Sequence, residues 1–177
     1  MLKIIINGGP GVGKDTVTDF VKKYTTFPVF NISTVDKVKE AHILLGWDGI
    51  KTSESRKALS DTKDMSTNLY DGPQRYIKES LSKIPDEAIV FIHSREPSEI
   101  AKFRIMFDTH TLLVRRETGE TVSNHADANV EKFEYDYIIE NDGTLDDLFV
   151  KTGKFFQKLG EDLDRKNETY KESNRKS

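Results

Sequence analysis

A run of glycines ending in a lysine lies near the N-terminus. The pattern G-x-x-x-x-G-K fits Gly8-Gly9-Pro10-Gly11-Val12-Gly13-Lys14. Glycines at this spacing let several backbone N–H groups point at one anion, because no Cβ atoms obstruct the approach. An apolar run precedes the loop at residues 2–6, and apolar side chains at helical spacing follow it. The pattern predicts a phosphate-binding loop between a strand and a helix; the alternative is an ordinary glycine-rich turn.

The loop also predicts a nucleotide and a metal. Lys14 would supply a cation for the β- and γ-phosphates. The next residue is Asp15, where a Ser or Thr usually holds Mg²⁺, and Thr16 follows. Asp15 either orders a magnesium-bound water or only adds favourable charge at a helix N-terminus. We expect ATP and Mg²⁺ as cofactors, with nucleotide contacts from Gly9, Gly11, Val12, Gly13, Lys14, Asp15 and Thr16.

Strand-like and helix-like segments alternate along the chain and predict an α/β fold. Short apolar runs typical of strands occupy residues 2–6, 28–32, 88–92, 109–114 and 135–139. Helical periodicity fills most of the intervals, including 53–84 with a break near Asp71-Gly72-Pro73. We expect a five-stranded, mainly parallel sheet with helices on both faces and ligands at the carboxyl ends of its strands. Four candidate core positions after the second strand are Val35, Val38, Ile43 and Leu44.

Composition narrows the classes of function. The chain of 177 residues has no cysteine, which excludes disulfides, thiolate metal sites and cysteine nucleophiles. Its formal net charge of -3 argues against nucleic acid or a membrane surface as a partner. Its longest apolar runs fall short of the ~18 residues that a membrane span needs. Because the first residues lack a signal-peptide layout, we expect a cytoplasmic protein.

Three segments resemble nucleoside monophosphate kinases. The phosphate loop continues as Gly13-Lys14-Asp15-Thr16, and Ile32-Ser33-Thr34-Val35-Asp36 is similar to the Ile-Ser-Thr-Gly-Asp segment of adenylate kinases. The Gly-Lys-Asp-Thr variant and residues 136–145 look most like phage-type deoxynucleoside monophosphate kinases. Val35 stands where adenylate kinases have glycine, so contacts to the acceptor are expected to differ.

The resemblance, over about residues 1–150, implies a three-layer P-loop NTPase fold. It implies one kinase domain at 1–163, with a helical acceptor insert at about 46–84 and a short lid at about 116–133. A charged, flexible tail would occupy 164–177. An aromatic residue of the insert, Trp47 or Tyr70, would either stack on a base or belong to the core.

The resemblance also implies roles for individual residues. The catalytic cations would be Lys14, Arg95 and Arg116. Contacts to the acceptor would come from Thr34, Asp36, Lys39, Arg56, Arg75 and Arg95. Asp15, Thr16 and Asp36 would hold Mg²⁺ through water. For the arginines the alternatives are surface ion pairs, such as Arg95 with Glu96 or Glu99. His93, at the expected end of a strand, is a further candidate for a polar contact with substrate.

These observations predict ATP-dependent phosphoryl transfer to a (deoxy)nucleoside monophosphate. No aspartate follows strand 88–92 and no Asn-Lys-x-Asp occurs, which argues against motor ATPases and GTPases. One alternative is a kinase like dephospho-coenzyme A kinase, whose hydroxyl acceptor would need Asp15 or Asp36 as a base. Another is a nucleotide-binding sensor without catalysis. The expected partner is a small-molecule nucleotide, homodimer formation is left open, and the acceptor's base and sugar stay undetermined.

Overall fold

Five short apolar strands pair into one parallel sheet. The computed structural model describes residues 1–116, 130 and 133–175. The strands are β1 (Leu2–Asn7), β2 (Val29–Ser33), β3 (Ile89–His93), β4 (His110–Arg115) and β5 (Tyr137–Glu140). Their order is β2-β3-β1-β4-β5, and every neighbouring pair is parallel. The phosphate loop therefore leaves the middle strand at the carboxyl edge of the sheet. The expected five-stranded parallel sheet is confirmed, and the central place of β1 is set by the tertiary structure.

The helices are longer than the strands. They are α1 (Lys14–Val21), α2 (Asp36–Leu44), α3 (Ser53–Tyr70), α4 (Gly72–Leu81), α5 (Pro97–Phe107) and α7 (Leu145–Arg175). The predicted break within 53–84 is confirmed, since Asp71 takes a left-handed conformation between α3 and α4. Pro97 is at the start of α5, where its missing N–H costs nothing.

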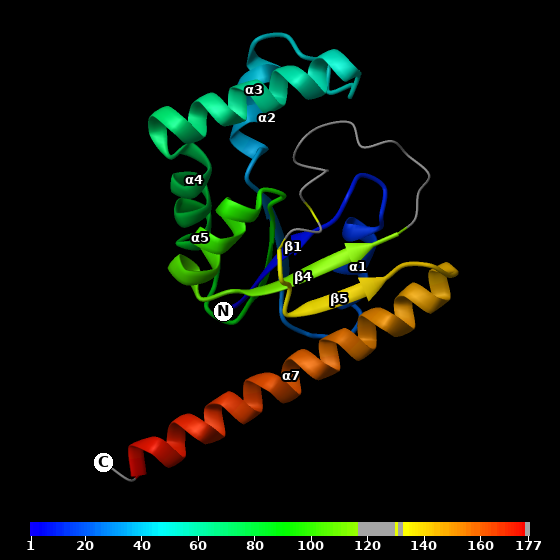
Figure 1. The fold of residues 1–177 in the computed structure, drawn as a ribbon, viewed down its shortest axis with the longest axis vertical. Helices are drawn as coiled ribbons and strands as arrows, with labels where there is room; N and C mark the ends of the chain where they lie inside the picture. The colour runs from blue at the N-terminus through cyan, green and yellow to red at the C-terminus, as the bar shows by residue number, and fades with distance from the viewer. Residues whose placement is uncertain (117–129, 131–132, 176–177) are drawn as a thin grey trace.

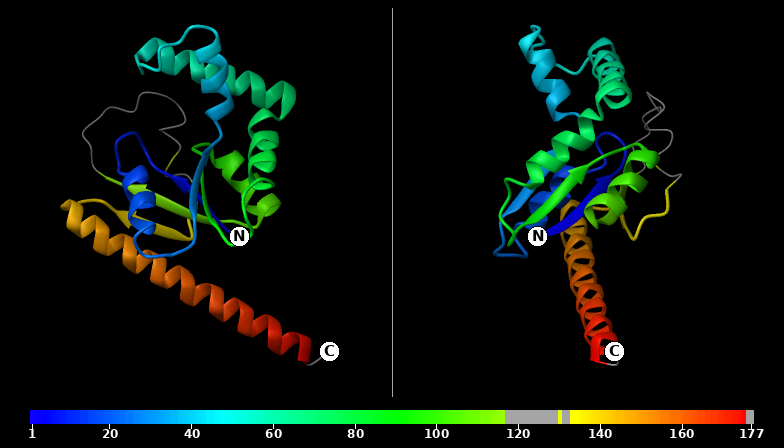
Figure 2. Two further views of the ribbon diagram at one scale, coloured as in Figure 1. Left: turned by 180° about the vertical axis from the view of Figure 1, so that it is seen from behind. Right: turned by 90° about the vertical axis from the view of Figure 1, so that its left-hand side faces the viewer.

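Two hydrophobic layers cover the two faces of the sheet (Figures 1 and 2). On one face α1 and α7 pack against alternate strand residues, among them Ile4, Ile6 and Phe91. On the other face α4 and α5 pack against the residues between, among them Ile5 and Ile92. Both faces are buried, which is why the central strands are continuous apolar runs. The three-layer fold predicted from the sequence is confirmed.

The helices α2 and α3 stand apart from these layers, beyond the carboxyl edge of the sheet (Figure 2). Of the predicted core positions here, Val38 is buried, but Ile43 is 56% exposed and Leu44 is 88% exposed. The prediction for these last two residues was wrong. Helical spacing marks one apolar face, but in the last turn of α2 it is His42 that faces a neighbouring helix, with its Nε2 2.8 Å from Thr62 Oγ1 of α3. Ile43 and Leu44 therefore remain exposed.

The helix α7 continues into the segment that was expected to be a tail. It runs without interruption to Arg175, passes along β5 and projects beyond the sheet (Figure 1). The boundaries of the domain and of the acceptor insert stay predictions. Most of the predicted lid, 116–133, lies outside the described residues. Among the helices that the structure describes, none combines the length and hydrophobicity needed to span a membrane.

The contact between α7 and the sheet gives a test of the fold. Leu159 is fully buried, whereas Leu145 on the same helix is 63% exposed. We expect Leu159→Ala to lower the free energy of unfolding by about 2–5 kcal/mol, because it leaves a cavity in the core. Leu145→Ala is the matched control and should change it by less than about 0.5 kcal/mol. Urea denaturation measures both; equal effects would contradict the packing of α7.

Candidate active site

The phosphate loop passes so close to β4 that only glycine fits at its start. Gly8 has a φ of 146°, and a Cβ placed there would lie 2.3 Å from the carbonyl oxygen of Val114. Gly13, with a φ of 99°, turns the chain into α1, and its Cβ would lie 2.8 Å from Asn141 Nδ2. These two close approaches give the loop its curvature, so its glycines are required by sterics as well as by a ligand.

Lys14 extends back over this loop. Its Nζ donates hydrogen bonds of 2.6 Å to the carbonyl oxygens of Gly8 and Gly9. The helix that Lys14 begins has Gly13 at its N-cap, and within the described residues no side chain caps that end. A cationic amine and the first N–H groups of α1 therefore face the same concave loop, which fits a phosphate group.

A buried amide supports the loop from below. Asn7 is fully buried, and its Oδ1 accepts a hydrogen bond of 2.7 Å from the N–H of Gly8. Its Nδ2 donates to the carbonyl oxygen of Arg95 at 3.3 Å and to the hydroxyl of Tyr135 at 2.6 Å. Sequence analysis did not single out Asn7; the one available signal was a polar residue closing an apolar strand.

A second asparagine supports the loop from β5. Asn141 is 5% exposed and donates from Nδ2 to the carbonyl oxygen of Val12 at 2.8 Å. Its own backbone N–H donates to the carbonyl oxygen of Arg115 at 2.7 Å. Three residues later Thr144 caps α7, accepting at Oγ1 from the N–H of Asp147 at 3.2 Å. The segment 141–144 thus holds the loop and begins a helix, as a turn-and-cap sequence predicts.

His93 stands between the phosphate loop and the acceptor side. On β3 it is in register with Ile6 of β1 and Ser33 of β2, the strands that lead to α1 and α2. Burial lowers its pKa to about 4, with smaller opposing influences from charges at Lys14, Asp15, Asp36 and Lys39. Its Nε2 hydrogen-bonds Asn31 Oδ1 at 3.1 Å. A neutral imidazole at pH 7 therefore separates the two halves of the site.

Asp36 and Lys39 pair at the start of α2. Lys39 Nζ lies 3.1 Å from Asp36 Oδ1, and Asp36 Oδ2 accepts from the N–H of Ser33 at 2.7 Å. Both side chains are about one-third exposed, at 30% for Asp36 and 35% for Lys39. The turn that carries the pair therefore places a carboxylate and an amine beside His93.

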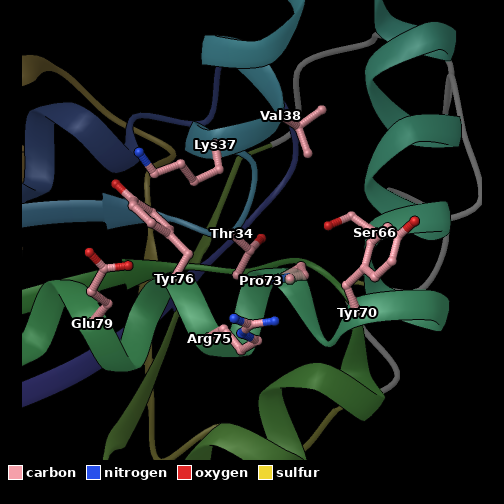
Figure 3. A pocket seen from close by; sticks show the side chains of 10 residues that line it. Thr34, Lys37, Val38, Ser66, Tyr70, Pro73, Arg75, Tyr76 and Glu79 are labelled. Atoms are coloured by element: carbon pink, nitrogen blue, oxygen red, sulfur yellow. The ribbon is translucent and has the colours of Figure 1, made fainter.

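A pocket of about 250 Å³ lies on the other side of α2 (Figure 3). It is lined by Thr34, Lys37, Val38, Ser66, Tyr70, Gly72, Pro73, Arg75, Tyr76 and Glu79. Two of the predicted acceptor residues, Thr34 and Arg75, are in this set. The Lys37 amine lies 5.6 Å from the centre of the Tyr76 ring. Because neighbouring helical positions are turned by about 100°, Lys37 faces this pocket while Asp36 and Lys39 face His93.

The remaining predicted cations are more widely spread. Arg56 is exposed in the first turn of α3, ten residues and about 15 Å along the helix from Ser66 of the pocket. Arg95 is half-buried in the loop after β3. Arg116 is exposed directly after β4, and its neighbour Arg115 pairs with Glu140 at 2.9 Å. Among the predicted acceptor residues, Thr34 and Arg75 thus lie at the pocket. Asp36 and Lys39 lie on the other side of α2, beside His93.

Three further candidates can be placed. Tyr70 is 60% exposed and lines the pocket, so the core alternative is wrong for it. Trp47 donates from Nε1 to the carbonyl oxygen of Ile50 at 2.9 Å and so closes its own loop. Glu99, one of the carboxylates considered for Arg95, forms an ion pair with Lys63 at 3.1 Å.

The expected metal residues are Asp15, Thr16 and Asp36. Asp15 is exposed at the start of α1 and Thr16 is half-buried. In the part of the chain that the structure describes, no three His, Asp or Glu side chains gather closely enough to hold a metal ion directly. Magnesium bound through water stays a prediction.

Known proteins share this fold at low identity. No family model matches the chain. A guanylate kinase of Halalkalibacterium halodurans is 23% identical over 167 residues, which cover 80% of each chain. TT1252 from Thermus thermophilus, at 19% identity, has a TM-score of 0.50 and is matched over 90% of this chain and 97% of its own. Shikimate kinase from Aquifex aeolicus, at 11% identity, also has a TM-score of 0.50, over 92% and 99%. The chain has the α/β fold of P-loop kinases.

The steric account of the loop gives a paired test. We expect Gly8→Ala to lower the free energy of unfolding by at least about 2 kcal/mol, because the new methyl group meets a backbone oxygen. Gly9→Ala is the control, since its Cβ would meet nothing closer than Val12 Cγ1 at 3.6 Å. Urea denaturation compares the free energies of unfolding of the two variants. A Gly8→Ala protein as stable as the wild type would contradict the close approach to β4.

The pKa of His93 predicts how stability depends on pH. In the unfolded chain this residue binds a proton below its ordinary pKa of 6.5, but in the folded protein only below about 4. The unfolded state is therefore favoured as pH falls through this window, by ~1–3 kcal/mol, and the full stability is present above it. His93→Asn should remove this part of the pH dependence. Denaturation curves at several pH values, without nucleotide or Mg²⁺, measure it; identical slopes in both proteins would contradict a buried neutral imidazole.

Proposed function

We propose that this protein transfers the γ-phosphoryl group of ATP to a (deoxy)nucleoside monophosphate and releases the two diphosphates. The observation that carries the proposal is the phosphate cradle of residues 8–14, with the Lys14 amine over it, opening beside His93 toward the start of α2. The related guanylate kinase is, by its name, a kinase acting on a nucleoside monophosphate. The assignment to the phage-type group within such kinases stays a prediction.

The loop and α1 would hold ATP. Backbone N–H groups of Gly9, Gly11, Val12 and Gly13 would bind its phosphates, with Lys14 and Thr16 beside them. When bound, Mg²⁺ would neutralise part of the phosphate charge, held through water by Asp15, Thr16 and Asp36.

Transfer itself would need positive charge and alignment more than acid–base chemistry. One oxygen of the acceptor phosphate would bond to the γ-phosphorus while the bond to the bridging oxygen breaks, leaving ADP. An acceptor phosphate is already ionised at pH 7, so no general base is required. Lys14, Arg95 and Arg116 would neutralise the charge spread over the moving group.

The acceptor would lie between α2 and the loop after β3. Lys39 and Arg95 would contact its phosphate from the side of α2 that faces His93, and Asp36 would keep Lys39 in place. Thr34 would contact the acceptor where this side meets the pocket. Arg75, in the pocket, and Arg56, at the far end of α3, would reach the acceptor only if the insert moved, so we assign them the outer part of the site.

The contacts of Asp36 argue against it as the base of a kinase with a hydroxyl acceptor, such as one like dephospho-coenzyme A kinase, for which Asp15 is the other candidate base. Both carboxylate oxygens of Asp36 already accept, one from Ser33 N–H and one from Lys39. A carboxylate held in this way is poorly placed to take a proton from a hydroxyl group. Abolished turnover in Asp36→Asn, together with a steep pH dependence in the wild type, would favour the hydroxyl acceptor.

Turnover on a panel of acceptors tests the proposed function. ADP release from ATP and Mg²⁺ is measured with ribo- and deoxyribonucleoside monophosphates. We expect turnover with at least one, and a loss of about 100- to 1000-fold in Lys14→Ala, because a cation is removed from the transferred group. Lys22→Ala is the control: it removes an exposed lysine of the same chain segment, which pairs with Asp19 at 2.7 Å. Nucleotide binding without turnover on any acceptor would contradict the proposal and favour a sensor.

A further inference from the structure

An almost buried ion pair joins α3 to α5. Lys63 Nζ lies 3.1 Å from Glu99 Oε2, and the two side chains are only 12% and 9% exposed. The same Oε2 accepts a hydrogen bond of 2.5 Å from the hydroxyl of Ser94, a residue that is 2% exposed. One carboxylate oxygen therefore joins α3 to a segment 36 residues away, in which the loop after β3 runs directly into the first turn of α5.

Stability alone does not account for this pair. Burying two charges costs hydration energy that their attraction seldom exceeds, and apolar side chains of similar size often stabilise a protein at least as well. The pair Lys57–Asp61 on the same helix, by contrast, is 75% and 62% exposed and stays hydrated. In this buried pair one carboxylate oxygen binds both the Lys63 amine and the Ser94 hydroxyl. It therefore fixes the distance and orientation between the segments that carry these groups, and we expect the pair to contribute to positioning.

The position that it fixes is that of the loop carrying Arg95. Asn7 Nδ2 donates to the carbonyl oxygen of Arg95, and Ile6 accepts from the N–H of Ser94 at 3.4 Å. Those contacts hold the loop from the side of β1. Glu99 holds the same loop through the Ser94 hydroxyl, and Lys63 extends that contact to α3.

We propose that Lys63 is a positioning residue: through Glu99 and Ser94 it joins the helical insert and the Arg95 loop into one unit. The acceptor, bound between α2 and the loop after β3, then meets Arg95 in a constant position. Lys63 acts through Glu99 and does not touch the substrate. This inference rests on the proposed function, in which Arg95 contacts the acceptor phosphate.

Kinetics of matched variants test the effect on the acceptor. We expect Lys63→Met and Glu99→Gln each to raise the KM for the acceptor and lower kcat/KM by about 10- to 100-fold. The KM for ATP should stay within about twofold, because the phosphate loop is not part of the unit. The double variant should be little worse than either single one, and Lys63→Arg should restore most of the activity. Lys57→Met is the control and should behave as wild type.

Hydrogen exchange without ligand tests the link itself. In Lys63→Met we expect faster exchange both in 53–70 and in 94–100, with α1 unchanged, whereas Lys57→Met should affect neither pattern. If Lys63→Met does not fold, Ser94→Ala replaces it: this variant keeps the ion pair but detaches the loop, so the acceptor KM should still rise.

Two results would overturn the inference. One is an equal loss of kcat/KM for ATP and for the acceptor, in proportion to the fraction of unfolded protein. A pair with a purely structural role would give that result. The other is unchanged exchange in 94–100 when Lys63 is replaced. If the wild-type protein phosphorylates no monophosphate, the proposed function fails, and hydrogen exchange still decides whether the insert and the loop form one unit.

Discussion

The side chain of Asn7 is the constraint on which the rest of the site depends. A fully buried amide must satisfy its hydrogen bonds inside the protein, and this one does so with three separate segments. It fixes the first N–H of the phosphate loop, the backbone of the Arg95 loop and the hydroxyl of Tyr135. Since an unsatisfied buried amide costs about 1–3 kcal/mol, these segments cannot move independently without loss.

Around Asn7, the contacts of the site become less buried with distance. The loop lies directly against β4 at Gly8, and Asn141, the residue after β5, hydrogen-bonds it at Val12. Farther out, Glu99 attaches the insert to the loop after β3. At the periphery the Asp36–Lys39 pair is partly hydrated. The rigid part of the site thus lies where phosphates would bind, and the more adaptable part lies where an acceptor would differ in base or sugar.

His93 shows how the sheet sets electrostatics as well as geometry. A strand end normally lies at the surface, but here the imidazole is partly buried, and that burial keeps it neutral at pH 7. A neutral side chain between two sets of charges separates the cations that would face ATP from those that would face the acceptor. An aspartate at the same position would add negative charge to a site that needs to attract two anions.

The sequence by itself determined the alternation of strands and helices, the phosphate loop and the order of the elements, because periodicity and steric freedom are properties of neighbouring residues. It also placed Lys14, Asp36 and Arg95 at strand ends. Only the tertiary structure decided what joins them. Asn7 reaches partners 88 and 128 residues away, and Lys63 reaches Glu99 across 36 residues. The tertiary structure also placed Thr34 and Arg75 on one side of α2 and Asp36 and Lys39 on the other. This arrangement depends on the orientation of α2, which is set by how the neighbouring helices pack. Such contacts follow from packing in three dimensions, which leaves no periodic signal along the chain.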